Sequence, residues 1–262
     1  MKSPKQLWQK WSIAVKVMPL MLAVAALKLL SHKYGLEVME LNALFTSLVA
    51  GTIFLIGFLI SGVLSDYKES EKIPSELSAS LRALFDDSYT IYKSKNSASA
   101  LQFIEFQKTL LPLLMDWFYK KDRTKTLLDK IGQMNDYFVE LDKEGIIPAY
   151  IIKMKNEQSY IRKLVLRVDT IRDTDFIGSA YAIVEAMGFL TGIGLIMIRI
   201  EPFYASLFVT LLVTFLISYM VFLIIDLDNP FDYSEKGETG TEIPLYPLHK
   251  LEESIKDFQT GL

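Results

Sequence analysis

Four long apolar blocks dominate the pattern of hydrophobic and polar positions along the chain. They cover residues 13–30, 44–64, 177–198 and 203–225, and few charged side chains interrupt them. A helix needs about 20 apolar residues to cross a hydrocarbon core of about 30 Å, and each block reaches or approaches that length. The pattern therefore predicts four transmembrane helices.

The segment between the second and third blocks, residues 65–176, has a different pattern. It holds most of the charge and few glycines, and its apolar residues recur three or four positions apart. That spacing predicts amphipathic helices and favours no strand. We expect breaks near Asn96, Asp122 and Gly145, and helices at residues 75–95, 98–119, 123–143 and 148–172.

The tail after residue 225 changes character again. Asn229 and Pro230 mark a turn, residues 235–242 are rich in glycine, threonine and charge, and a short helical pattern covers residues 247–258. The fold class predicted is an all-α integral membrane protein. Its parts are an N-terminal leader with two spans (1–64), a helical cytoplasmic domain (65–176), two further spans (177–225) and a cytoplasmic tail (226–262).

Lysines near the start of the chain set the expected orientation. Basic residues that flank a span stay on the cytoplasmic side, and four of them precede or enter the first block: Lys2, Lys5, Lys10 and Lys16. Both termini and residues 65–176 are then cytoplasmic, in a multi-pass protein of the plasma or inner membrane. A signal peptide cleaved near Ala25 is the alternative, but the apolar block continues to Leu30, and its removal would leave an odd number of spans.

Composition excludes several classes of function. The net charge is −3, and no clustered basic face indicates nucleic acid binding. The chain has no cysteine, which excludes disulfides, thiolate metal sites and a cysteine nucleophile. Its two histidines, His32 and His249, lack the spacing of a metal site, and no phosphate-binding loop is present. We therefore expect no metal, no cofactor and, without paired carboxylates or a nucleophile motif, no enzyme activity.

The second block carries a periodic face. Positions three or four residues apart share one side of a helix, and here that side is polar at its ends and aromatic in its middle: Ser47, Ala50, Phe54, Phe58, Ser61 and Ser65. Several copies of such a helix around an axis would enclose a pore with hydroxyl-lined mouths and a hydrophobic waist. Ordinary packing between helices in lipid is the alternative interpretation.

Three ionisable residues, Lys16, Lys28 and Glu185, lie within or at the margins of the apolar blocks. A charged group costs about 2.5 to 3.5 kcal/mol at the centre of a membrane helix. For the lysines we expect snorkelling to the interface. Glu185 lies deeper and needs a partner, a water-filled vestibule or a proton, so a role in an ion pathway and a simple interfacial position are both open. Gly188 and Gly192 beside it favour close helix packing.

Two stretches around the inner ends of the second and third spans resemble the bestrophin family and its bacterial relatives. Residues 57–72, GFLISGVLSDYKESEK, are similar to the family's second span running into a YDRWWEGRK-like turn, with Asp66 among the departures. Residues 170–184, TIRDTDFIGSAYAIV, are similar to a TPIPxAYxIH stretch that leads into the third span. Tyr181 matches, and Glu185 stands one place beyond the family's histidine.

The tail provides the most specific part of this resemblance. The sequences DNPFD at 228–232 and EIPL at 242–245 are similar to the family's NPFG and DIPL motifs in order and spacing. The acidic run that binds calcium in eukaryotic members is largely missing, so no calcium clasp is expected.

The resemblance implies a homopentamer in which the second span lines an anion-conducting pore, with chloride as the expected ion. It assigns the neck to Ala50, Phe54 and Phe58 and a cytoplasmic constriction to Ile147 or Ile151. The periodic face of the second span then predicts pore mouths at Ser47, Ser61, Ser65 and Asp66. Acidic residues at the inner end of the second span, Asp66, Glu69 and Glu71, favour a cation-conducting member as the alternative. A non-conducting membrane scaffold or sensor is the third interpretation.

Overall fold

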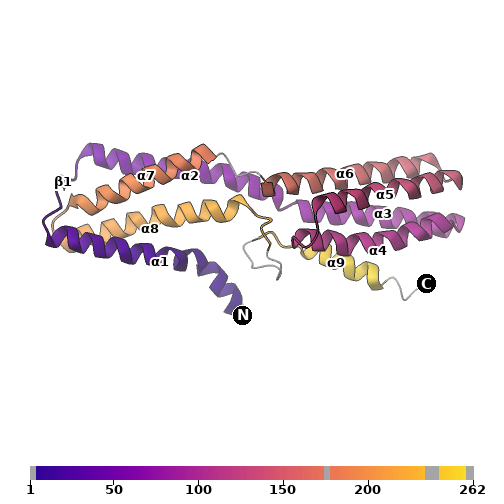
Figure 1. Ribbon diagram of the computed structural model, residues 1–262, viewed down its shortest axis with the longest axis horizontal. Helices are drawn as coiled ribbons and strands as arrows, with labels where there is room; N and C mark the ends of the chain where they lie inside the picture. The colour runs from indigo at the N-terminus through magenta and orange to yellow at the C-terminus, as the bar shows by residue number, and fades with distance from the viewer. Residues whose placement is uncertain (1–3, 174–177, 234–241, 258–262) are drawn as a thin grey trace. The chain divides into compact units, whose positions relative to one another are not determined.

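The computed structural model describes residues 4–173, 178–233 and 242–257, and the chain divides into two compact units (Figure 1). The membrane unit combines Met1–Tyr67 with Asp175–Asn229, and the helical unit combines Lys68–Thr174 with Pro230–Leu262. The C-terminal tail therefore packs within the same unit as the central helices. Residue 177, the expected start of the third span, and most of the polar run at 235–242 lie outside the described residues.

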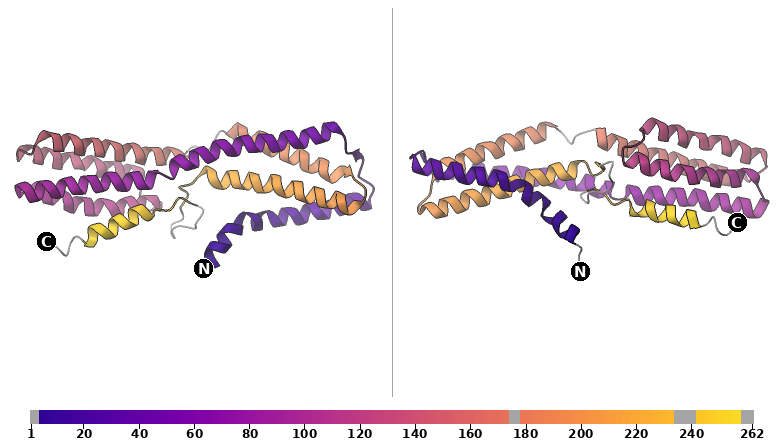
Figure 2. Two further views of the ribbon diagram at one scale, coloured as in Figure 1. Left: turned by 180° about the vertical axis from the view of Figure 1, so that it is seen from behind. Right: turned by 60° about the horizontal axis from the view of Figure 1, so that its bottom comes forward.

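The apolar blocks form four long helices: α1 (Pro4–Lys33), α2 (Ala43–Ser70), α7 (Gly178–Met197) and α8 (Phe203–Asp228). Among the described residues, four helical stretches are long and apolar enough to cross a membrane. The fold is thus that of a multi-pass integral membrane protein, as the sequence predicts. Within the unit, α1 lies against α7 and α8, and α7 lies against α8 (Figures 1 and 2).

A short pairing that the sequence pattern does not predict joins the two loops of the membrane unit. β1 (Met39–Glu40) pairs in parallel with β2 (Ile198–Arg199), with Met39 opposite Ile198 and Glu40 opposite Arg199. Two residues per strand are too few to produce an alternating pattern in the sequence. The pairing ties the loop after α1 to the turn between α7 and α8.

The helical unit is a closed four-helix bundle with a fifth helix on its side. α3 (Ile73–Lys95), α4 (Ala98–Phe118), α5 (Thr124–Lys143) and α6 (Pro148–Asp173) follow one another, and α6 returns to pack on α3. α9 (Tyr246–Asp257) lies against α3 and α4 (Figures 1 and 2). The bundle helices begin and end within two residues of the positions that their apolar spacing predicts.

Turn chemistry at the predicted breaks explains why these boundaries are so regular. Asn96 takes a left-handed conformation with φ of 51°, and its N–H donates to the carbonyl of Tyr92 as α3 ends. Ser97 then caps α4 by accepting a hydrogen bond of 3.0 Å from the Ala100 N–H. Gly145, with φ of 72°, supplies the left-handed residue between α5 and α6 that a side chain would disfavour.

Candidate functional site

The face of α2 singled out by the sequence pattern is exposed along its whole length. Phe54 and Phe58 are 73% and 74% exposed, and the smaller side chains of the same face are exposed as well: Ser47, Ala50, Ser61 and Ser65. Asp66, next to Ser65 at the C-terminal end of this face, is also exposed. One chain therefore leaves this row of hydroxyl, methyl and phenyl groups without cover.

The opposite face of α2 is buried and fixes the helix in rotation. Ile56, Leu59 and Val63 form a core with Val184 of α7 and Ile217 of α8. Because these side chains hold one side of α2, the row from Ser47 to Ser65 has to point away from the unit.

Two further contacts hold the N-terminal half of α2. The hydroxyls of Thr52 and Thr191 are 3.0 Å apart and hydrogen-bond inside the unit. The ring of Phe45 lies over Gly194, where a Cβ atom would come within 2.4 Å of the ring. Any side chain at Gly194 would force the buried Phe45 ring to shift, so this glycine allows the ring to pack against α7.

The hydroxyl groups on the exposed face differ in their partners. Ser47 donates a hydrogen bond of 2.8 Å to the carbonyl of Ala43 one turn earlier, which leaves its lone pairs free to accept. Within the ranges that the structure describes, the hydroxyls of Ser61 and Ser65 have no partner. These groups are available to water or to a passing ion.

The predicted cytoplasmic constriction divides between two environments. Ile147 is 57% exposed, whereas Ile151 is buried in the bundle at 9% exposure. A side chain that packs inside its own unit does not face a pore, so Ile147 alone of this pair remains a candidate. Ile152, the next residue after Ile151, is exposed instead.

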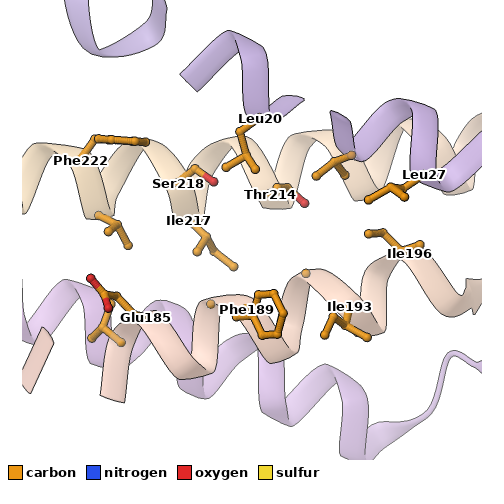
Figure 3. Close-up of a pocket in the computed structure, with 15 residues that line it drawn as sticks. Leu20, Leu27, Glu185, Phe189, Ile193, Ile196, Thr214, Ile217, Ser218 and Phe222 are labelled. Carbon is orange, nitrogen blue, oxygen red and sulfur yellow. The ribbon is translucent and has the colours of Figure 1, made fainter. Parts of the chain in front are cut away.

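Glu185 lies on the wall of a cavity of about 530 Å³ between α1, α7 and α8 (Figure 3). No residue of α2 lines this cavity. The fold therefore separates Glu185 from the exposed face of α2, and within one chain it does not join the two into a single path. The carboxylate has no ion pair or hydrogen bond among the described residues.

The two lysines of the first span do not behave alike, and snorkelling is wrong for Lys28. Its side chain is fully buried, and its ammonium lies 2.7 Å from Glu37 Oε1 and donates 2.5 Å to the carbonyl of Ile198. Lys16 is more than half exposed and lies 3.6 Å from Asp226 of α8. An internal partner, rather than the interface, neutralises Lys28.

Glu37 connects this buried lysine to a histidine at the surface. Its second oxygen lies 2.8 Å from His32 Nδ1, and the His32 ring stacks on Phe203 at 3.9 Å. Burial raises the pKa of Glu37, but the hydrogen bonds and charges of His32 and Lys28 outweigh it, and the net pKa lies below the usual value. No spacing in the sequence predicts this cluster, because its partners come from separate segments.

Among the residues described, no group of three or more histidine, aspartate or glutamate side chains is arranged to hold a metal ion. The polar clusters of the chain are ion pairs and helix caps, and the exposed face of α2 remains the feature most suited to a function outside the chain.

Comparison with known proteins rests on structure. No protein-family model and no curated protein matches the sequence. A variant of a bacterial bestrophin homologue from Klebsiella pneumoniae superposes with a TM-score of 0.78 at 15% identity, over 94% of this chain and 97% of that one. The chain has the bestrophin fold. A second variant of that homologue gives a TM-score of 0.78 at 15% identity, over 92% of this chain and 98% of that one. A structure of a membrane protein gives 0.77 at 14% identity, over 92% and 97%.

The bestrophin fold confirms the fold that the three sequence stretches imply, and the tail motif has a clear structural role in it. Phe231 and Tyr233 are buried in the helical unit. The Tyr233 hydroxyl donates 2.5 Å to the carbonyl of Ile243, and the Ile243 N–H donates 3.0 Å to that of Pro230. These bonds join the two halves of the motif across the stretch between them.

Arg172 fastens this tail to the end of α4. Its guanidinium donates to the carbonyls of Phe118 at 2.7 Å, Trp117 at 3.3 Å and Phe231 at 3.3 Å. It also stacks on the Trp117 ring, 4.7 Å from the centroid. A positive charge at the C-terminus of a helix satisfies carbonyls that have no partner within the helix and complements the helix dipole.

Proposed function

We propose that the chain is the subunit of a homopentameric ion channel in the cell membrane, with α2 lining the pore. The observation that carries the proposal is the exposed face of α2, which one chain leaves uncovered while the opposite face is packed. The likeness to bestrophin homologues supports it, since the resemblance supplies both the pore helix and the number of subunits.

The chemistry of this face favours a pore over contact with lipid. The exposed positions of α8 include Phe208, Leu212 and Leu216, which suit hydrocarbon. The exposed face of α2 instead ends in hydroxyls at Ser47 and Ser61. Polar side chains of membrane helices face protein or a water-filled space.

The neck of the proposed pore consists of Ala50, Phe54 and Phe58. Rings of phenyl groups form a hydrophobic constriction, from which water withdraws readily. An ion that crosses it loses hydration without gaining a fixed ligand. Ser47, Ser61, Ser65 and Asp66 would form the mouths, and Ile147 would contribute the cytoplasmic constriction.

The ion is proposed to be an anion, chloride first, on the basis of the family resemblance. Cation conduction is the second candidate, because Asp66, Glu69 and Glu71 are exposed and rings of carboxylates select cations. The sign of the reversal potential of the purified protein in bilayers under a salt gradient distinguishes these candidates. A non-conducting scaffold would give no current.

The proposed arrangement places both termini, the helical unit and the tail in the cytoplasm, and it requires no metal, cofactor or catalytic residue. Native mass spectrometry in mild detergents tests the stoichiometry, and a pentamer is the expected result. A monomer or dimer across several detergents would contradict the channel.

Shortening the neck residues tests the pore directly. Phe54→Ala and Phe58→Ala, alone and together, should raise conductance or open probability several-fold, because a wider ring holds water. Phe208→Ala removes an equally exposed ring from α8 and should leave currents unchanged.

The chain has no cysteine, so single cysteines report accessibility without background. Ser61→Cys should react with a charged thiol reagent and block the current, and Phe208→Cys should not react.

The outcome that contradicts a pore concerns the variant with both Phe54→Ala and Phe58→Ala. If it assembles normally and its currents equal those of the wild type, α2 has only a packing role.

A further inference from the structure

The cavity of the membrane unit has an almost wholly apolar wall. It measures about 530 Å³ and lies between α1, α7 and α8. Its lining is largely aliphatic and aromatic, with Leu20, Leu27, Phe189, Ile193 and Phe222 among the side chains drawn in Figure 3. Volumes of this size accommodate small organic ligands.

Three polar side chains in this wall, Glu185, Thr214 and Ser218, have no hydrogen-bond or ion-pair partner among the residues described. Glu185 extends into the cavity from α7 (Figure 3), and no hydrogen bond or ion pair is made by its carboxylate. Thr214 is 7% exposed, and its hydroxyl is buried without a hydrogen bond. A buried hydroxyl that lacks a partner costs roughly 1 to 3 kcal/mol, so a bound donor would stabilise Thr214. Glu185 is exposed toward the cavity in the single chain and is open to a bound cation.

The charge of Glu185 restricts what can pair with it. A phospholipid headgroup carries a phosphate, which a carboxylate would repel, whereas a single ammonium on a hydrocarbon body would be attracted to it.

We propose that this cavity binds a lipophilic amine. The hydrocarbon part lies along the apolar wall, and the protonated amine pairs with the Glu185 carboxylate. Charge complementarity selects this class, because an ammonium neutralises the one acidic group of the lining, whereas a fatty acid would be repelled by it. The site lies apart from the face of α2 and does not depend on the proposed conduction.

The glycines of α7 leave the space open and indicate how to close it. A Cβ atom at Gly188 would lie 3.3 Å from Ile217 Cγ2, so this position is a close contact with α8. A Cβ atom at Gly192 would meet nothing within 4 Å, although Gly192 lines the cavity. A leucine at Gly192 would therefore occupy the cavity without a clash at its first atom.

Equilibrium binding of radiolabelled decylamine to the full chain in lipid nanodiscs tests the proposal, with decanol as the neutral probe of equal length. Empty nanodiscs provide the correction for partition into lipid. Wild type should show one saturable amine site per chain and bind decanol at least about tenfold more weakly. Glu185→Gln should lower the affinity for decylamine to that for decanol.

Gly192→Leu should abolish saturable binding of both probes, and Gly192→Ala should weaken it less. Leu190→Phe adds bulk to an exposed position of α7 outside the cavity and should bind as wild type does. Equal affinity of wild type for both probes would overturn the proposal in favour of a plain acyl-chain groove. No saturable amine binding to folded wild type, or unchanged amine affinity in Glu185→Gln, would also overturn it.

Discussion

The two units of the chain use helices of similar length in opposite ways. In the helical unit the bundle closes on itself, and side chains such as Phe103, Ile131 and Val165 are fully buried. In the membrane unit only 22% of each apolar window is buried within the chain. The first unit carries its own hydrophobic core, whereas the second leaves most of its apolar surface uncovered by its own chain.

The units also differ in how their ion pairs are placed. Exposed pairs of the helical unit, such as Lys143 with Glu140, contribute about 1 kcal/mol or less. Asp87 is buried there, but its partner Lys153 is exposed. The membrane unit buries Lys28 against Glu37. Apolar packing thus dominates the helical unit, whereas an ion pair with both partners buried fixes the loops of the membrane unit.

A Phe→Ala substitution in each unit should give the largest difference in lost stability. Phe103→Ala empties a fully buried position and should lower the free energy of unfolding of the helical unit by about 3 to 5 kcal/mol. Phe208→Ala, at a position 65% exposed in the membrane unit, should cost about 0.5 kcal/mol or less in detergent. Hydrogen exchange of the amides of α4 and α8 measures both, and similar losses would remove the distinction between the units.

The buried lysine provides the next contrast, within the membrane unit itself. Lys28→Met leaves the Glu37 carboxylate without its buried partner and should cost about 3 kcal/mol, measured as a lower midpoint of urea unfolding in detergent. Lys16→Met removes an exposed lysine 3.6 Å from Asp226 and should cost less than about 1 kcal/mol. Equal midpoints for the two variants would mean that the Lys28 pair does not fix the loop.

The Lys28–Glu37 pair also predicts that the folded chain loses stability at low pH. The pKa of Glu37 lies below its ordinary value of 4.5 in the folded chain, so folding favours the ionised form. Its stabilising contribution is complete above about pH 4.5 and is lost as the pH falls through the lowered pKa. Glu37→Gln should flatten the stability profile below about pH 4.5, whereas an unchanged slope would assign this loss of stability to other carboxylates.

The smallest effect concerns the turn between α3 and α4 in the helical unit. Glu144 accepts hydrogen bonds from the Ser97 hydroxyl and, at 3.1 Å, from the Ser99 N–H, and the hydrogen bond from Ser97 is the main cause that lowers the pKa of Glu144. Ser97→Ala also removes the cap of α4 and should cost about 1 kcal/mol, measured by thermal unfolding. Ser159→Ala, at an exposed position of α6, is the neutral control. Equal melting temperatures for the two variants would mean that the Ser97 cap does not stabilise the unit.

Local signals explain how much of the fold the sequence predicts. Asn96, Ser97 and Gly145 punctuate a strongly periodic stretch, so the helices of the bundle could be located from neighbours in the sequence alone. The length of the four apolar blocks likewise located the transmembrane helices. The face of α2 could also be predicted, because one helix contains all of its residues.

What the sequence did not reveal depends on distant partners. Lys28 bonds to the carbonyl of Ile198, 170 residues away, and no spacing rule links the two. Ile147 and Ile151 share an apolar character but not a side of the bundle, and only packing separates them. The cavity beside Glu185 is bounded by three helices, and its volume depends on how their side chains meet.

The guanidinium of Arg172 gives the tail a permanent attachment. A dissolved cation occupies a set of carbonyl oxygens in proportion to its concentration, by mass action. A cation that belongs to the same chain is held at one fixed effective concentration, whatever the surrounding solution contains. The contact that Arg172 makes with Phe118 and Phe231 is therefore constitutive, formed once when the chain folds and insensitive to dilution or to chelators.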